Sequence, residues 1–303
     1  MNWLLVVIIA YLIFAVVYVI DKFLISSVEL EPVAYAFYVG ILSLFILVLI
    51  PFDFGLMPFW HIISSFSSGI LFVFGLLFFY KAFQKHEMSK ITPVFGAAVP
   101  IFTFILAYLF LRERLALDEF IAFILLVIGS VIIMKPDKDS ILTIRDSIRG
   151  IGNAIFGAFL IAGSYVLSKY VYQYQSFINS FIWIRTGSVL GAFLLLVKSS
   201  NRQKIFKEAK VFKIRTVGLI AFNKLFSACG FIILNYAVYL GSVSLVNAFQ
   251  GIQYFFLLII AVIFSKKMPH ILKEEINRRI ITQKIIAILF ISVGLAILAI
   301  GLI

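Results

Sequence analysis

The chain has 303 residues, of which 63% are hydrophobic and only 13% are charged. A soluble domain carries roughly a quarter charged residues, so the composition excludes an ordinary soluble protein. The formal net charge is +12, but the distribution of these charges described below argues against a nucleic-acid partner.

Uncharged apolar runs follow one another along the chain, and most approach the roughly 20 residues of helix that cross a hydrocarbon core. The first six are residues 3–20, 33–52, 62–80, 91–111, 120–134 and 151–168. Residues 177–197 form a seventh run, which Arg185 interrupts. Residues 225–265 carry no charge over 41 positions and divide naturally at Gly241-Ser242, and residues 285–303 form the last run. The sequence therefore predicts an all-α membrane protein of ten transmembrane helices.

The 26 Lys and Arg residues are distributed unevenly among the connections between these spans. The odd-numbered connections hold 21 of them, the connections 4–5 and 6–7 hold three, and Arg185 and Lys224 lie inside spans. Basic residues near span ends stay on the cytoplasmic side. We therefore expect a multi-pass protein of the cell membrane with odd-numbered connections in the cytoplasm and both termini outside.

Two halves of the chain share a pattern. Residues 18–23 (YVIDKF) correspond to residues 165–170 (YVLSKY), Ala82, Ser89 and Gly96 recur 155 positions later, and Gly129 corresponds to Gly294. The sequence predicts a first five-helix repeat over residues 1–134, a basic amphipathic linker over 135–149 and a second repeat over 150–303. Because five is odd, the second repeat must be inverted in the membrane, as in many alternating-access carriers.

The fourth span and its exit contain residues 91–100 (ITPVFGAAVP) and 111–114 (LRER), which are preceded by Tyr80-Lys81-Ala82 and followed by Gly129 of the fifth span. In these residues the chain resembles the EamA-type family of the drug/metabolite transporter superfamily. The resemblance implies ten helices in two inverted repeats and a cavity lined chiefly by the fourth and ninth spans. It implies no particular substrate, because members carry amino acids, nucleotide sugars, sugar phosphates and drugs. The family usually has cytoplasmic termini, which disagrees with the charge distribution.

Two cations lie near the middle of predicted spans, where an ionisable group costs about 2.5–3.5 kcal/mol and marks a functional site by default. They are Arg185 and Lys224, and all fourteen acidic residues lie in connections or within a turn of a span end. A cationic interior predicts an anionic or carboxylate-bearing substrate, held by the Arg fork and the Lys point charge. The alternatives are that Arg185 snorkels or binds helix carbonyls, and that Lys224 is neutral when the site is empty.

The ninth span has a polar face. Asn247, Gln250 and Tyr254 follow helical spacing, which suits either a cavity wall or interhelical hydrogen bonding. Asn223, beside Lys224, has the same two interpretations. Trp183 either stacks on a substrate or packs in the core.

These features together predict a secondary transporter of a small anionic or zwitterionic metabolite, such as an amino acid, working by alternating access. The alternative is a membrane-embedded enzyme or receptor subunit. We expect no enzyme activity, no cofactor and no metal, since the three His residues lie at separate span ends and no phosphate-binding Gly loop is present. The expected partners are the metabolite and the lipid bilayer, with monomer and homodimer both open.

Overall fold

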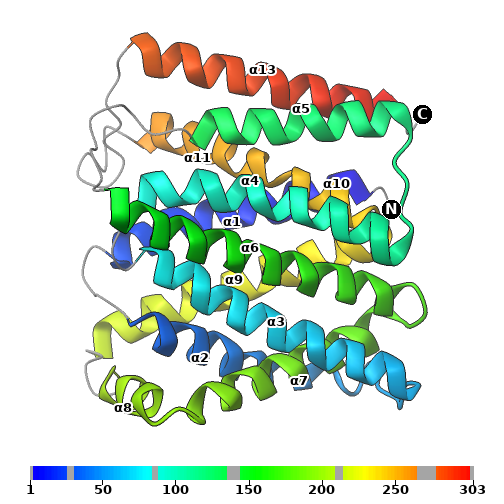
Figure 1. Cartoon of the computed structure of the whole chain (residues 1–303), viewed down its shortest axis with the longest axis vertical. Coiled ribbons are helices and arrows are strands. Elements are labelled where there is room, and N and C mark those ends of the chain that lie inside the picture. The colour runs from blue at the N-terminus through cyan, green and yellow to red at the C-terminus, as the bar shows by residue number, and fades with distance from the viewer. Residues whose placement is uncertain are drawn as a thin grey trace. The chain divides into compact units, whose positions relative to one another are not determined.

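The computed structural model describes residues 3–25, 31–83, 88–134, 144–208, 214–264 and 278–300 (Figure 1), and within these ranges every regular element is a helix. In chain order they are α1 (Trp3–Ile25), α2 (Pro32–Leu42) continued by the 3₁₀ helix η1 (Ser43–Leu49), α3 (Phe59–Phe83), α4 (Met88–Leu106) continued by the π-helical turn η2 (Ala107–Leu111), α5 (Leu117–Met134), α6 (Ile144–Tyr172), α7 (Phe177–Leu196), α8 (Ser199–Glu208), α9 (Ile214–Leu240), α10 (Val243–Ala248), α11 (Gln250–Phe264) and α13 (Arg278–Ile300).

Helices occupy all ten positions where the sequence predicts spans. Among the described residues, seven helical segments are long and apolar enough to cross a membrane. They are α1, α2 with η1, α3, α4 with η2, α6, α7 and α13. The other three positions hold α5, α9 and the pair α10–α11, so ten crossings remain a prediction. The predicted division at Gly241-Ser242 is confirmed, because α9 ends at Leu240 and the Ser242 hydroxyl caps α10.

The helices form two compact units, and each takes helices from both halves of the chain. Unit 1 comprises Met1–Glu29, Arg114–Ile141 and Lys213–Ile303, and unit 2 comprises Leu30–Glu113 and Leu142–Phe212. Of the predicted linker, residues 135–143 lie outside the described residues and 144–149 form the first turns of α6.

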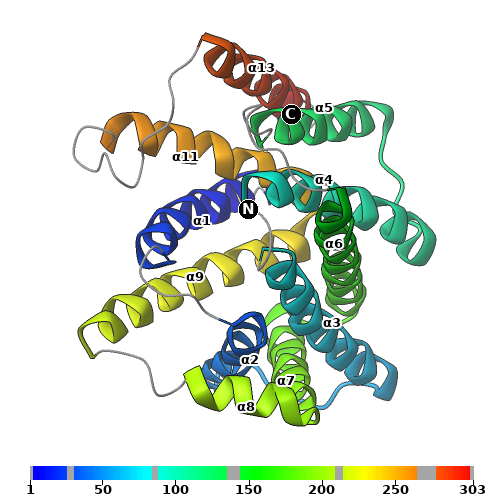
Figure 2. The same ribbon diagram turned by 60° about the vertical axis from the view of Figure 1, so that its left-hand side comes forward.

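In unit 2, α3 packs against both α6 and α7 (Figure 2). Glycines allow the close approach that is typical of membrane helix pairs. A Cβ on Gly75 of α3 would lie 2.8 Å from the Ile161 side chain of α6, and one on Gly187 of α7 would lie 2.6 Å from Phe66 Cα of α3. Farther along α3, Phe79 lies against Gly157 of α6 and Val73 lies against Gly191 of α7. The order of these contacts shows that α3 is antiparallel to α6 and parallel to α7.

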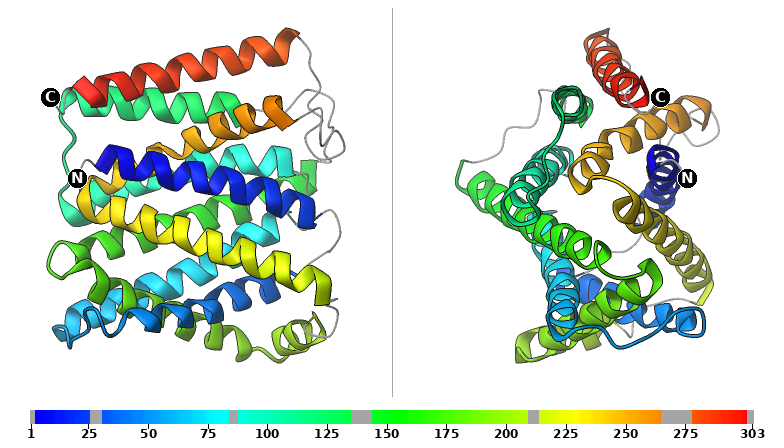
Figure 3. Two further views of the ribbon diagram at one scale, coloured as in Figure 1. Left: turned by 180° about the vertical axis from the view of Figure 1, so that it is seen from behind. Right: turned by 90° about the vertical axis from the view of Figure 1, so that its right-hand side faces the viewer.

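Unit 1 contains two antiparallel pairs, α1 with α9 and α5 with α13 (Figure 3). A Cβ on Gly230 of α9 would lie 2.9 Å from the Ile13 side chain and 3.2 Å from Phe14 of α1. Gly129 of α5 is as closely packed, since its Cβ would lie 2.7 Å from the Ile291 side chain of α13.

Candidate functional site

Arg185 is held inside unit 2 by two aromatic rings. It is the ninth residue of α7 and lies roughly 12 Å along the helix from Phe177. Arg185 is only 8% exposed. The guanidinium carbon lies 4.8 Å from the ring centroid of Phe72 on α3 and 5.2 Å from that of Phe181, one turn earlier on α7. Each such contact contributes about 0.5–2 kcal/mol. The rings therefore offset part of the cost of a central charge without neutralising it.

Residues of α6 and α3 that carry hydroxyl groups belong to the same unit as this guanidinium. Tyr165 and Tyr172 of α6 lie within electrostatic range of Arg185. One turn before Phe72, the Ser68 hydroxyl is 2.9 Å from the Ser164 carbonyl oxygen, to which it donates, and 2.8 Å from the Ser168 hydroxyl. The described contacts of the guanidinium are therefore with Phe72 and Phe181, while the three serine hydroxyls join α3 to α6 in the same unit.

These hydroxyl residues were not predicted as site residues, although the sequence contains one signal for them. Tyr165 and Ser168 belong to the segment 165–170 that corresponds to 18–23. The repeated motif could therefore have pointed to the site as well as to the fold.

The indole of Trp183, the other predicted site residue of unit 2, makes a hydrogen bond and ring contacts within the protein. Its Nε1–H donates to the Gly55 carbonyl at 3.1 Å. The ring stacks on Phe54 with centroids 5.6 Å apart and also contacts Phe66. These contacts favour the packing interpretation over stacking on a substrate.

The remaining predicted residues belong to unit 1. Asn223 is fully buried on α9 and Asn247 is buried on α10, where its Nδ2 donates to the Val243 carbonyl at 2.9 Å. Tyr254 of α11 interacts electrostatically with Tyr18 of α1. Lys224 belongs to α9, but its side chain lies outside the described part of the structure.

The residues of the predicted polar face, Asn247, Gln250 and Tyr254, do not all lie on one helix. Phe249, with φ of −66° and ψ of −6°, separates α10 from α11, so Asn247 lies on α10 and the other two on α11. Phe249 is fully buried and its ring packs against Trp3 with centroids 5.6 Å apart. This packing coincides with the separation of α10 from α11, and discontinuous helices occur at transporter binding sites.

The structure thus groups the seven predicted residues by unit. Arg185 and Trp183 lie on α7 of unit 2, and the other five lie in unit 1. No group of three His, Cys, Asp or Glu side chains suited to a metal ion occurs among the residues described.

Apolar helices of membrane-spanning length define a multi-pass membrane protein. Residues 1–135 match the EamA-like transporter family, which confirms the predicted resemblance and is consistent with an EamA-type drug/metabolite transporter.

Two further comparisons bear on the fold and on relatives. Among solved structures, one titled only "Crystal structure of protein" is similar over 97% of both chains, with a TM-score of 0.70 and 13% sequence identity. That likeness concerns the fold alone. A search of curated protein sequences gives no match.

Proposed function

We propose that this protein is a secondary carrier that moves a small anionic or zwitterionic metabolite, such as an amino acid, by alternating access. The observation that carries the proposal is the buried Arg185, with Tyr165 and Tyr172 within electrostatic range, in a chain whose residues 1–135 match a transporter family. A guanidinium offers a planar pair of donors that fits a carboxylate or phosphate.

The distribution of acidic groups supports an anionic substrate. The carboxylates whose side chains the structure describes all lie in connections or at helix ends, and they are Glu31, Asp53, Glu113, Asp118 and Glu119. A carrier of organic cations would need a carboxylate near the middle of a span, where Arg185 lies instead.

Equivalent contacts in the two halves support an inverted repeat. The offset of 155 that relates Ala82 to Ala237 also relates Gly75 to Gly230, and both glycines are tightly packed. Their partners Ile161 and Phe14 are 147 positions apart, which is the offset between Tyr165 and Tyr18. The α3–α6 contact of unit 2 therefore has a counterpart in the α9–α1 contact of unit 1.

The pair α5–α13 gives a second, independent sign of the repeat. Gly129 approaches Ala287 and Ile291, and Gly294 approaches Ala122 and Leu126. Ala287 and Ile291 lie seven and three positions before Gly294. Ala122 and Leu126 likewise lie seven and three positions before Gly129. Two antiparallel helices related by a local two-fold axis make contacts of this kind, as inverted repeats require.

Uptake into proteoliposomes tests the proposal. We expect Arg185→Met to abolish counterflow of the anionic substrate identified by screening amino acids, carboxylates and sugar phosphates, and Arg185→Lys to reduce it at least tenfold, because Lys lacks the planar fork. Lys224→Met should also abolish it.

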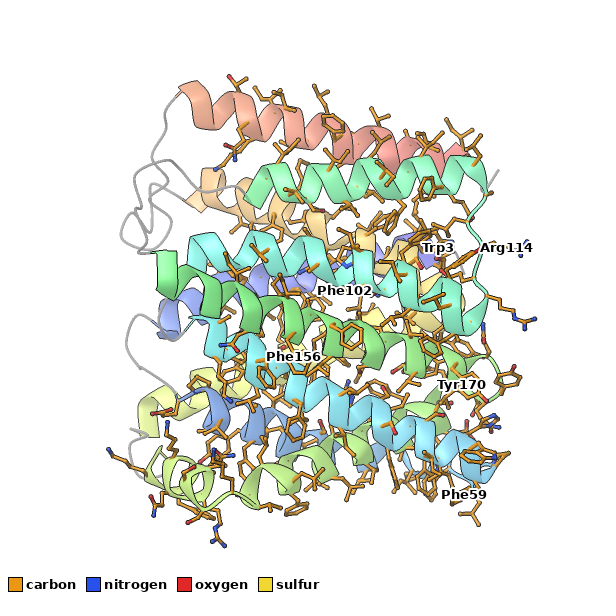
Figure 4. All side chains as sticks on the ribbon, in the orientation of Figure 1. Trp3, Phe59, Phe102, Arg114, Phe156 and Tyr170 are labelled. Atoms are coloured by element: carbon orange, nitrogen blue, oxygen red, sulfur yellow. The ribbon has the colours of Figure 1, made fainter. Side chains whose placement is uncertain are left out.

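Arg114→Gln is the control, since Arg114 lies in the exposed connection between α4 and α5 and its side chain extends away from the helices (Figure 4). Full activity of the folded Arg185→Met protein on an anion would remove Arg185 from the site. Full activity of Lys224→Met as well would overturn the anionic-substrate proposal.

A further inference from the structure

One end of unit 2 carries a cluster of exposed cations. Lys81 lies in the last turn of α3, Lys198 lies between α7 and α8, and Lys204 lies on α8. Lys81 interacts electrostatically with both of the other lysines. Since α3 and α7 are parallel, both helices end on this side. We call these three residues the lysine patch.

Among the side chains that the structure describes, the lysine patch has more cations nearby than carboxylates. Glu31 pairs with Lys204 at 3.0 Å, whereas Arg202 and Lys207 add two more exposed cations on α8. The side chains described at this end therefore include five cations and one carboxylate. The dipoles of α3 and α7 favour one cation at each C-terminus, but they do not account for further cations on α8.

The cations of α8 are held on a fixed element. Ile205 is 1% exposed, and its carbonyl accepts a hydrogen bond from the Tyr38 hydroxyl at 3.2 Å. At the start of the helix, Asn201 Nδ2 donates to the Leu195 carbonyl of α7 at 3.0 Å. The lysine patch is thus preorganised, which lowers the entropy lost when an anion binds.

An exposed apolar stripe leads along α7 to the lysine patch. It consists of Leu190, Phe193, Leu194 and Val197, which are 40%, 54%, 47% and 78% exposed and follow helical spacing. On α8, Phe206 is 58% exposed beside the cations. A cationic cluster at the end of an apolar stripe matches a phospholipid, with the negative headgroup at the cations and an acyl chain along the helix.

We propose that the lysine patch binds the headgroup of an anionic phospholipid, whose acyl chain lies along the apolar stripe of α7. Charge complementarity selects the headgroup, and the stripe distinguishes a lipid from a soluble anion. The proposal concerns a surface separate from Arg185, so it holds or fails independently of the transported substrate.

Native mass spectrometry of the purified full chain with equimolar phosphatidylglycerol and phosphatidylcholine of identical acyl chains tests this site. The wild type should retain phosphatidylglycerol preferentially. Each juxtamembrane cation strengthens anionic-lipid binding about fivefold. Lys81→Gln and Lys198→Gln should therefore each reduce the preference about fivefold, and the double variant about 25-fold.

The matched control is Arg114→Gln, which removes one exposed cation that is not part of the lysine patch and should leave the preference unchanged. Circular dichroism checks that each variant is folded, and the single variants decide the test if the double variant does not fold. Equal retention of the two lipids by wild type, or an undiminished preference in the folded variants, overturns the proposal.

A thermal-shift measurement with glycerol phosphate separates a lipid from a soluble anion. Glycerol phosphate has the phosphate but no acyl chain, so it should raise the melting temperature far less than short-chain phosphatidylglycerol does. An equal rise with both would assign the lysine patch to soluble anions and overturn the lipid proposal.

Discussion

Two serines on α3, less than one turn apart, differ in how their buried hydroxyls are satisfied. Ser68 donates to the Ser164 carbonyl and contacts the hydroxyls of Ser164 and Ser168. The Ser65 hydroxyl is fully buried and makes no hydrogen bond within the described part of the structure. A buried hydroxyl stabilises a protein only when it has a partner, so these residues form a matched pair.

We expect Ser68→Ala to lower the free energy of unfolding by about 1 kcal/mol, because it removes the bonds that join α3 to α6. The melting temperature in detergent should fall by about 2–4 °C. Ser65→Ala should leave it unchanged or raise it, since no bond is lost. Equal destabilisation by the two substitutions would show that the Ser68 contacts contribute nothing specific.

The sequence identified Arg185 as a candidate site residue but did not identify the residues around it, for a physical reason. A charge within an apolar run is conspicuous in any sequence. Phe72, Tyr165 and Ser68 are ordinary residues of membrane helices, and they become informative only when packing places them beside the guanidinium. For Trp183 the relevant contact is the Gly55 carbonyl, a backbone group 128 positions away that no local pattern reveals.

At the scale of helices, glycine positions decide which pairs pack closely. Gly129 of α5 faces α13, whereas an added Cβ on Gly152 of α6 would meet no atom within 4 Å. We expect Gly129→Val to cost about 1–3 kcal/mol through overpacking against Ile291 and the Ala287 carbonyl. Gly152→Val should be neutral or slightly stabilising, because valine has the higher helix propensity.

Thermal unfolding measures the stability of the Gly129→Val and Gly152→Val variants, and a third variant, Gly294→Val, tests the opposite side of the same helix pair. If α5 and α13 are related by a local two-fold axis, Gly294→Val should destabilise the protein about as much as Gly129→Val does. A loss at only one of the two glycines would argue against equivalent packing, even with both helices intact.

The helices themselves were largely predictable, whereas the break in the ninth span was not. Uncharged runs located helices at all ten predicted positions, and Gly241-Ser242 marked the end of α9. The ninth span has no proline, and its only glycine, Gly251, follows the break at Phe249. That break coincides with the contact between Phe249 and Trp3, a tertiary interaction across almost the whole chain.

At the scale of the whole molecule, a few matches at constant offsets predicted a repeat, but the sequence did not predict which helices make up each unit. Each unit combines helices from both halves, as α3 with α6 and α1 with α9 show. Uniformly apolar helices contain little information about which neighbour they prefer, because every one of them can face lipid or another helix.

The ends of unit 2 bear on orientation in the membrane. Lys81, Lys198 and the cations of α8 lie at one end. The opposite end has Arg112 and Lys169, and Lys169 interacts electrostatically with Glu113. This asymmetry agrees with cytoplasmic odd-numbered connections, whereas the family resemblance implies cytoplasmic termini and the opposite orientation.

Cysteine labelling in intact cells decides between the two orientations. Ser200 and Gln173 are both exposed and flank α7 at opposite ends, and Cys229 is first replaced by Ser because it is exposed. With basic connections in the cytoplasm, Ser200→Cys should resist a membrane-impermeant maleimide until the cells are permeabilised, and Gln173→Cys should react at once. The reverse pattern would place the termini in the cytoplasm. It would also mean that the lysine patch lies on the outer surface, where attraction to anionic lipids of the cytoplasmic leaflet could not have set the orientation.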